Sequence, residues 1–147
     1  MSWGVIQHHF GDRDGLLSAV IEDAVDRLVA SLEVLADPER VMGTEDLVRS
    51  TWEAFANPKA MAGLEILIAA KNLRGGLGGQ HMQRLGAALA ALIARLNTGT
   101  DREHGVALGM LLWTTPVAMM LAEMFATPPL TITDAQKAVA KLIDEHR

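Results

Sequence analysis

Apolar side chains recur at intervals of three and four residues along most of this chain, which is the pattern of amphipathic helices. The clearest run extends from Asp12 to Leu35, where mostly acidic residues separate the apolar positions. The same spacing predicts further helices at about 44–56, 58–72, 80–96, 100–126 and 133–147. The chain has no convincing alternating strand pattern and no internal repeat, so we predict an all-α fold.

Residues with capping chemistry mark several of these helix ends. We expect Asp12 to cap the first helix and Asn57 to cap the third, with Pro58 in its first turn. The segments 100–103 and 133–136 have capping-box spacing, in which a Thr hydroxyl and an acidic or amide side chain each satisfy a free backbone amide. They therefore predict where the last two helices begin. Pro116 should kink or interrupt the fifth helix.

The stretch from Gly105 to Ala122 contains no charged residue. It approaches the length of about 20 residues that spans a bilayer, so a transmembrane helix is one interpretation. Gly, Thr and Pro at interrupting positions and the absence of flanking basic or aromatic belts argue against it. We expect instead a buried central helix, part of whose surface packs against a second copy of the chain, and no membrane contact.

Composition limits the compartment and the partners. The 147 residues include no cysteine, which excludes a disulfide framework, a thiol nucleophile and Cys-ligated zinc, and favours a cytoplasmic location. The first fifteen residues lack the basic start and apolar run of a signal peptide. With 13 basic and 18 acidic side chains, the net charge of −5 argues against non-specific nucleic-acid binding by this chain alone.

The most specific motif lies in the first twenty residues. Ser2 has the character of an N-cap, and Ile6 occupies an apolar position. His9 and Phe10 follow, and Arg13 stands at a turn. In this order they resemble the recognition helix, and the start of the next helix, of the TetR family of bacterial transcriptional regulators. The resemblance implies a helix-turn-helix whose second helix enters the major groove. The residues that it places at DNA are Ser2, Trp3, Gly4, Gln7, His8, His9 and Arg13.

Two features depart from the family's pattern. Gln7 stands where the family usually has a phosphate-contacting Tyr. The family's first two helices are missing, and without them we expect poor operator binding, because they position the recognition helix. Met1 occupies a position where the family has Val, so we expect a GTG start codon inside a longer reading frame with roughly 30 to 45 further residues.

Beyond residue 20 the resemblance is architectural. It implies a helix-turn-helix remnant at 1–20 and an effector-binding and dimerisation domain at 21–147, with the last two helices forming a homodimer interface. The expected function is a TetR-like regulator, a repressor that responds to a small apolar effector and contacts operator DNA only when the missing helices are present. The alternative is a genuine short dimer that binds a ligand or sequesters a partner without binding DNA.

Effector pockets of this kind are apolar cavities with a few polar groups. Methionine and tryptophan at helical spacing are more often plain core. Glu65 lies on the same stripe as Met61, so it is either solvent-facing or a polar anchor for a ligand. The ligand-binding candidates are Trp52, Phe55, Met61, Glu65, Met82, Met110, Trp113 and Met119.

No other chemistry is indicated. His8 and His9 are adjacent and diverge by about 100° on a helix, so they do not form a metal pair. We expect His81 and His104, which have no partner at metal-ligand spacing, to be exposed and structurally idle. The Gly-rich segment 75–79 is followed by Gln80 rather than by the Lys of a phosphate-binding loop. We therefore expect no catalysis, metal or cofactor.

Overall fold

The computed structural model describes residues 11–69, 79–96, 102–123 and 131–146. These ranges contain helices and short turns and no strand, which confirms the predicted all-α class. The helices are α2 (Arg13–Ala36), α3 (Thr44–Phe55), α4 (Pro58–Ala69), α5 (Gly79–Leu96), α6 (Arg102–Glu123) and α7 (Ile132–Glu145). The predicted capping box at 100–103 lies partly outside the described residues.

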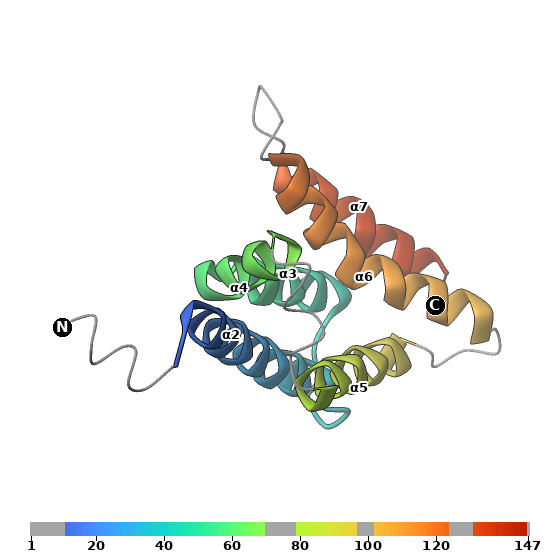
Figure 1. Cartoon of the computed structure of the whole chain (residues 1–147). Helices are drawn as coiled ribbons and strands as arrows, with labels where there is room; N and C mark the ends of the chain where they lie inside the picture. The colour runs from blue at the N-terminus through green and yellow to red at the C-terminus, as the bar shows by residue number, and fades with distance from the viewer. Residues whose placement is uncertain (1–10, 70–78, 97–101, 124–130, 147) are drawn as a thin grey trace.

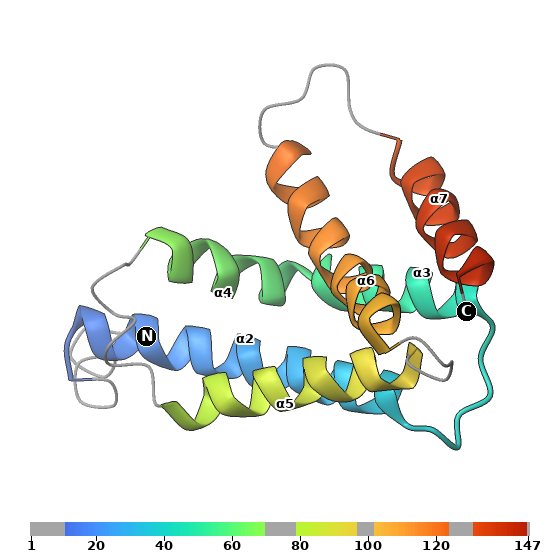
Figure 2. The same ribbon diagram turned by 90° about the vertical axis from the view of Figure 1, so that its right-hand side faces the viewer.

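The longest helix, α2, runs between α4 on one side and α5 on the other (Figures 1 and 2). It begins as predicted, because the Asp12 carboxylate accepts a hydrogen bond of 2.8 Å from the Gly15 amide. The predicted domain boundary at residues 20 and 21 falls inside this continuous helix. Its buried stripe follows the helical period and joins the core: Ile21, Ala24, Val25, Val29, Leu32 and Leu35.

The end of α2 is held by a side chain from α5. Arg95 donates to the carbonyl oxygens of Leu35 and Asp37, each at 2.6 Å, and also to that of Arg40. The last turn of α2 contains no basic residue of its own. Arg95 therefore satisfies backbone acceptors that the helix end leaves free, and it ties α5 to the turn that leads into α3.

Two glycines let neighbouring helices approach closely. A Cβ placed on Gly63 of α4 would lie 2.3 Å from the Cβ of Ala24 in α2. A Cβ placed on Gly109 of α6 would lie 2.8 Å from the Cα of Ile93 in α5. Both distances are shorter than any ordinary carbon contact, so these two crossings depend on the missing side chain.

Helix α6 continues through its proline. Pro116 is buried, and the helix is not interrupted between Arg102 and Glu123, contrary to one of the two expected outcomes. Two residues earlier, the hydroxyl of Thr114 donates to the carbonyl of Met110 at 2.8 Å. The tertiary contacts of α6 with α5, α3 and α7 outweigh the cost of the single amide that proline removes.

The predicted start of α7 was wrong by one or two residues. The helix begins at Ile132, and Thr131 stands at the N-cap position without a side-chain capping bond. The capping box expected to begin at Thr133 therefore lies inside the first turn. Ile132, the first residue of the helix, is half-buried. By contrast, Asn57 caps α4 as predicted, accepting a bond of 3.0 Å from the Lys59 amide.

By length and composition α6 could cross a membrane. The segment Glu103–Glu123 has a mean hydropathy of 1.7 over its best window, and 33% of that window is buried. The helix is therefore apolar on faces that the rest of the described chain does not cover. Among the described residues, four of the exposed large apolar side chains lie on α6 and one on α7: Val106, Met110, Leu111, Leu121 and Leu142.

Candidate ligand-binding site

Most of the predicted DNA-contacting residues lie outside the described part of the chain. Ser2, Trp3, Gly4, Gln7, His8 and His9 belong to this group. Arg13 is described: it is the first residue of α2 and is exposed to solvent. A cation at this position is free of ion-pair partners among the described residues.

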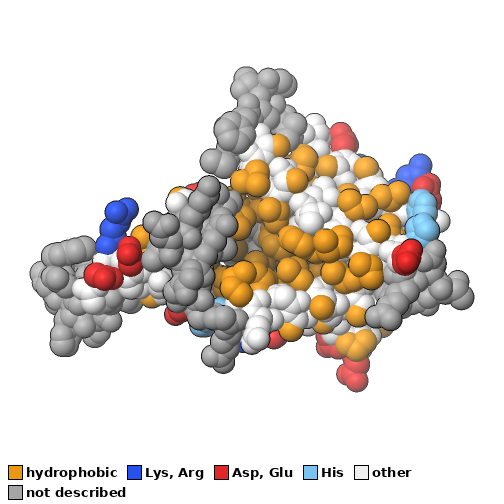
Figure 3. All heavy atoms as spheres, turned by 45° about the vertical axis from the view of Figure 1, so that its right-hand side comes forward, with side chains coloured by type: hydrophobic (Ala, Val, Ile, Leu, Met, Phe, Trp, Pro, Cys, Tyr) orange, Lys and Arg blue, Asp and Glu red, His pale blue; other side chains and the backbone are white. Residues whose placement is uncertain are grey.

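The described chain has a large apolar face that is hollowed at its centre. Figure 3 shows this face, where apolar side chains gather over the region bordered by α4, α5 and α6. Helix α5 packs on α2 and α6, whereas α4 packs on α2 and α3 and makes no extensive contact with α5 or α6 within the described ranges. Within the described ranges, the hollow is therefore bordered by helices that do not all cross one another.

Four of the predicted ligand-binding residues come from the helices around this hollow. Met61 of α4 is half-buried, while Met82 of α5 and Met110 of α6 are 42% and 45% exposed. Trp113 of α6 is half-buried and packs against the core. Three helices thus carry flexible apolar side chains and one indole ring that are not fully buried, the residue types typical of an apolar binding surface.

The other four candidates are not part of this group. Trp52 and Phe55 of α3 are almost fully buried, at 3% and 6% exposure, which is typical of core residues. Met119 lies on a different face of α6 from Trp113, because six residues correspond to a rotation of about 240°. Glu65 is exposed, so the solvent-facing alternative holds for its carboxylate.

Trp113 carries the only ring nitrogen in the described region that is buried without a hydrogen-bond partner. Its Nε1 is fully covered, and no acceptor lies within hydrogen-bonding distance and geometry. Tryptophan N–H groups usually find an acceptor when they are buried. The one comparable side-chain atom is the hydroxyl of Thr51, on the fully buried face of α3.

A polar cluster joins α2 to α5, and the sequence did not reveal it. The carboxylate of Asp26 lies 3.1 Å from Nδ1 of His81 and accepts a bond of 2.7 Å from Arg84. The prediction that His81 is exposed and structurally idle was therefore wrong, since its side chain is 25% exposed and paired with Asp26. His104 is exposed. The i, i+3 spacing of His81 and Arg84 was the one available signal that both face a common partner.

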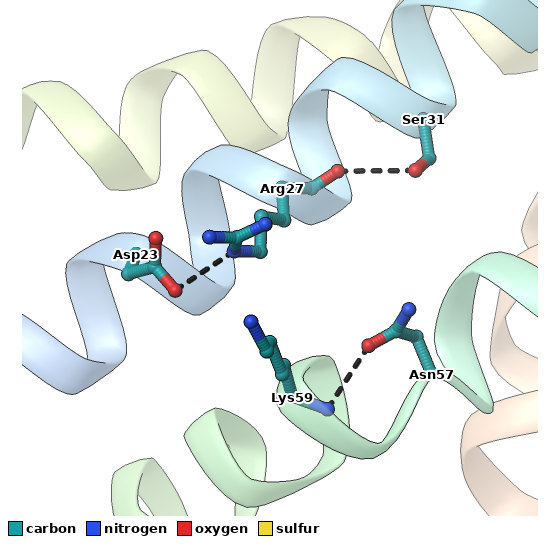
Figure 4. A network of polar contacts seen from close by, with 5 residues as sticks. All are labelled: Asp23, Arg27, Ser31, Asn57 and Lys59. Carbon is teal, nitrogen blue, oxygen red and sulfur yellow. Dashed lines mark hydrogen bonds and ion pairs between the residues drawn. The ribbon is translucent and has the colours of Figure 1, made fainter.

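A second polar pair lies on the surface of α2, on the side of α4. Arg27 donates to the carboxylate of Asp23 at 2.8 Å, and Lys59 of α4 points toward this pair (Figure 4). The hydrogen bond from Arg27 holds the pKa of Asp23 below its usual value, and the positive charge of Lys59 acts in the same direction. Exposed pairs of this kind contribute little stability.

The described surface also has grooves with polar lining beside α3. One groove, of about 270 Å³, lies between α3 and α7 and is lined by side chains of both charges, including Glu45, Arg49 and Lys137. Another lies between α2 and α3. Within the described ranges no three His, Asp or Glu side chains are placed to hold a metal ion. No family model matches the chain, and no curated protein or solved structure is detectably similar to it.

Proposed function

We propose that this chain is the effector-binding and dimerisation domain of a TetR-like transcriptional regulator, a cytoplasmic repressor that releases its operator when a small apolar molecule binds. The observation that carries this proposal is the hollowed apolar face between α4, α5 and α6. A soluble domain exposes an apolar surface of this extent where it binds a ligand or a partner. The proposed role is binding rather than catalysis.

The DNA-reading part of the proposal rests on the resemblance of residues 2–20 to the family's recognition helix. In this arrangement α2 follows the recognition helix directly and also packs against α4 and α5, next to the hollow. A ligand that displaced these helices would therefore move α2 and the DNA-reading segment with it. This is allostery through the different affinities of two conformations for one ligand.

Dimerisation through α6 and α7 is supported by the outward face of α6. The side chains opposite its buried stripe are exposed and uncharged: Ala107, Leu111, Ala118 and Leu121. We favour a second copy over a bilayer as the occupant, because α6 is flanked by α7, whose exposed residues include Lys137, Lys141 and Asp144. A helix that spans a membrane cannot hold such a neighbour in the hydrocarbon.

The dimer is tested by Leu111→Glu, which places a charge on the outward face of α6. We expect sedimentation velocity to give a dimer for the native chain and a folded monomer for the variant. Val41→Glu, in the turn between α2 and α3, is the matched control, because it introduces the same charge at a fully exposed apolar residue and should leave the dimer intact. A native chain that sediments as a monomer at micromolar concentration would contradict the proposed interface.

A second candidate is a dimer that binds the same ligand without DNA. The net charge of −5 favours it, because DNA affinity depends on clustered Lys and Arg. The first measurement is the genomic sequence at and upstream of the Met1 codon. A GTG codon in an open frame that encodes two further helices supports the regulator, whereas an ATG behind an in-frame stop supports the second candidate.

The direct test is a gel shift with the chain extended to include those helices. We expect the extended protein to bind its own promoter region and the 147-residue chain to bind it far more weakly. Failure of the extended protein to bind any fragment of that region would leave the ligand-binding dimer as the better description.

A further inference from the structure

Two buried polar side-chain atoms in the described chain lack a hydrogen-bond partner, and their surroundings differ. The hydroxyl of Thr51 is on a residue with 0% exposure, enclosed by the core of α3. The indole N–H of Trp113 belongs to a half-buried residue on α6, next to the apolar face. A buried donor without an acceptor costs folding free energy, so it calls for a specific explanation.

The side of α6 on which Trp113 lies follows from its neighbour Gly109. Gly109 faces α5, because a side chain there would meet Ile93 at 2.8 Å. Trp113 lies one turn further along α6 on nearly the same face, since four residues correspond to a rotation of about 400°. Beyond this crossing α5 and α6 diverge (Figures 1 and 2). The position of Trp113 on α6 therefore borders the hollow, and its Nε1 is covered by neighbouring side chains, which a ligand has to displace to reach it.

The side chains around this position are apolar and uncharged. Met110 and Val117 lie within one turn of Trp113 on the same side of α6, and Leu85 and Leu89 of α5 are half-buried. Neither arginine of α5 is available to neutralise a ligand. Arg84 is paired with Asp26, and Arg95 is bound to the backbone at the end of α2.

We propose that the indole N–H of Trp113 donates a hydrogen bond to an acceptor atom of the effector, and that the effector is a neutral, mainly apolar molecule with a carbonyl, ether or aromatic nitrogen. This proposal rests on the ligand-binding part of the proposed function. A donor surrounded by apolar groups selects strongly for a ligand that can pair with it. A carboxylate or phosphate ligand is disfavoured, because no free cation faces the site among the described residues.

The test uses pairs of probes that have the same shape and differ in one acceptor. Quinoline is compared with naphthalene, and benzophenone with diphenylmethane. Each is titrated into the ¹⁵N-labelled full chain, and the indole N–H resonances are followed by NMR. Trp113→Phe identifies the resonance of interest, and Trp52→Phe, in the core of α3, is the matched control.

We expect quinoline or benzophenone to shift the Trp113 N–H resonance downfield and to bind about threefold to tenfold more tightly than its hydrocarbon partner. Trp113→Phe should remove this preference and Trp52→Phe should keep it. If Trp113→Phe fails to fold, the resonance is assigned in the native chain by elimination with Trp3→Phe and Trp52→Phe, and the shift itself decides.

Three results would overturn the proposal: no binding by any acceptor-bearing probe, equal binding of both members of each pair, or an indole resonance unmoved at saturation. The experiment involves no DNA, so its failure is separable from that of the regulator. Hydrocarbon binding without an indole response would refute the role of Trp113 and leave the ligand site standing. Loss of DNA binding by the extended chain would refute the regulator and leave the role of Trp113 untouched.

Discussion

Replacing Arg95 tests whether one long-range side chain holds the end of α2. Its guanidinium reaches three carbonyl oxygens, those of Leu35, Asp37 and Arg40, from a helix about 60 positions later in the chain. Arg95→Met keeps the apolar stem and removes every donor. Arg95→Lys keeps the charge but replaces the planar fork with a single ammonium group, which cannot reach all three acceptors in the same geometry.

The expected cost follows from the exposure of these bonds. A hydrogen bond from a charged donor contributes about 1.5–3 kcal/mol when its acceptor is shielded from water. The bond to Leu35 is partly buried, whereas those to Asp37 and Arg40 are exposed, so water can replace them when Arg95 is removed. We therefore expect Arg95→Met to lower the free energy of unfolding by about 2–3 kcal/mol and Arg95→Lys by about 1 kcal/mol. For a chain of this size, the larger value corresponds to a fall in Tm of about 5–10 °C.

Urea unfolding followed by circular dichroism at 222 nm measures these differences, with the slope m compared to confirm that the same surface is exposed. Arg49→Met is the control, because Arg49 pairs within α3 with Asp46 and both side chains are more than half exposed. Its effect should stay within about 0.5 kcal/mol. The reasoning is refuted if Arg95→Met matches this control, or if Arg95→Lys is as unstable as Arg95→Met.

Three further substitutions test other contacts. Gly109→Ala should destabilise the chain by about 1–3 kcal/mol, because its Cβ would meet the α5 backbone at 2.8 Å. Gly86→Ala has open space around it and should stabilise the chain by about 0.5–1 kcal/mol. Urea unfolding must therefore give changes of opposite sign in the free energy of unfolding for the two variants. Thr51→Val removes a buried hydroxyl without a partner and should raise the free energy of unfolding by about 1 kcal/mol; a loss of stability would show that the hydroxyl is satisfied. The pKa of Asp23 is lowered in the folded chain. Its contribution to stability is therefore present above the unfolded pKa of about 3.9 and is lost as the pH falls through the folded pKa. An NMR titration should show that the pKa of Asp23 is higher in Arg27→Gln than in the native chain.

The helices could be predicted because their signals are local. Apolar spacing and the side chains of Asp12 and Asn57 specify where α2 and α4 begin, and both capping bonds form as expected. The start of α7 differs, because the helix begins at Ile132, before the motif at Thr133, and no side-chain capping bond marks its first turn. A capping motif in the sequence therefore does not by itself fix the first residue of a helix.

The site was predicted less completely, because its features join distant parts of the chain. Asp26 and His81 are 55 positions apart, so nothing in the sequence pairs them. Trp113 was an expected pocket residue on the basis of residue type alone, and its unpartnered N–H is visible only once the surrounding helices are in place. Trp52 and Phe55 had the same residue character but lie in the core, because the periodicity of α3 turns both inward.

The packing around the hollow also decides which of its walls could move. Helix α6 is held by α5, α3 and α7, and at Gly109 it has no room to approach α5 further. Helix α4 is held mainly by α2, through the tight contact of Gly63 with Ala24, and to a smaller extent by α3. A ligand that widened the hollow would therefore displace α4 more readily than α6. Because Gly63 is in tight contact with Ala24, such a displacement would act on α2, the helix that follows the proposed DNA-reading segment. The ligand can shift the equilibrium between the two forms only by as much as its affinities for them differ. Each tenfold difference in affinity corresponds to about 1.4 kcal/mol.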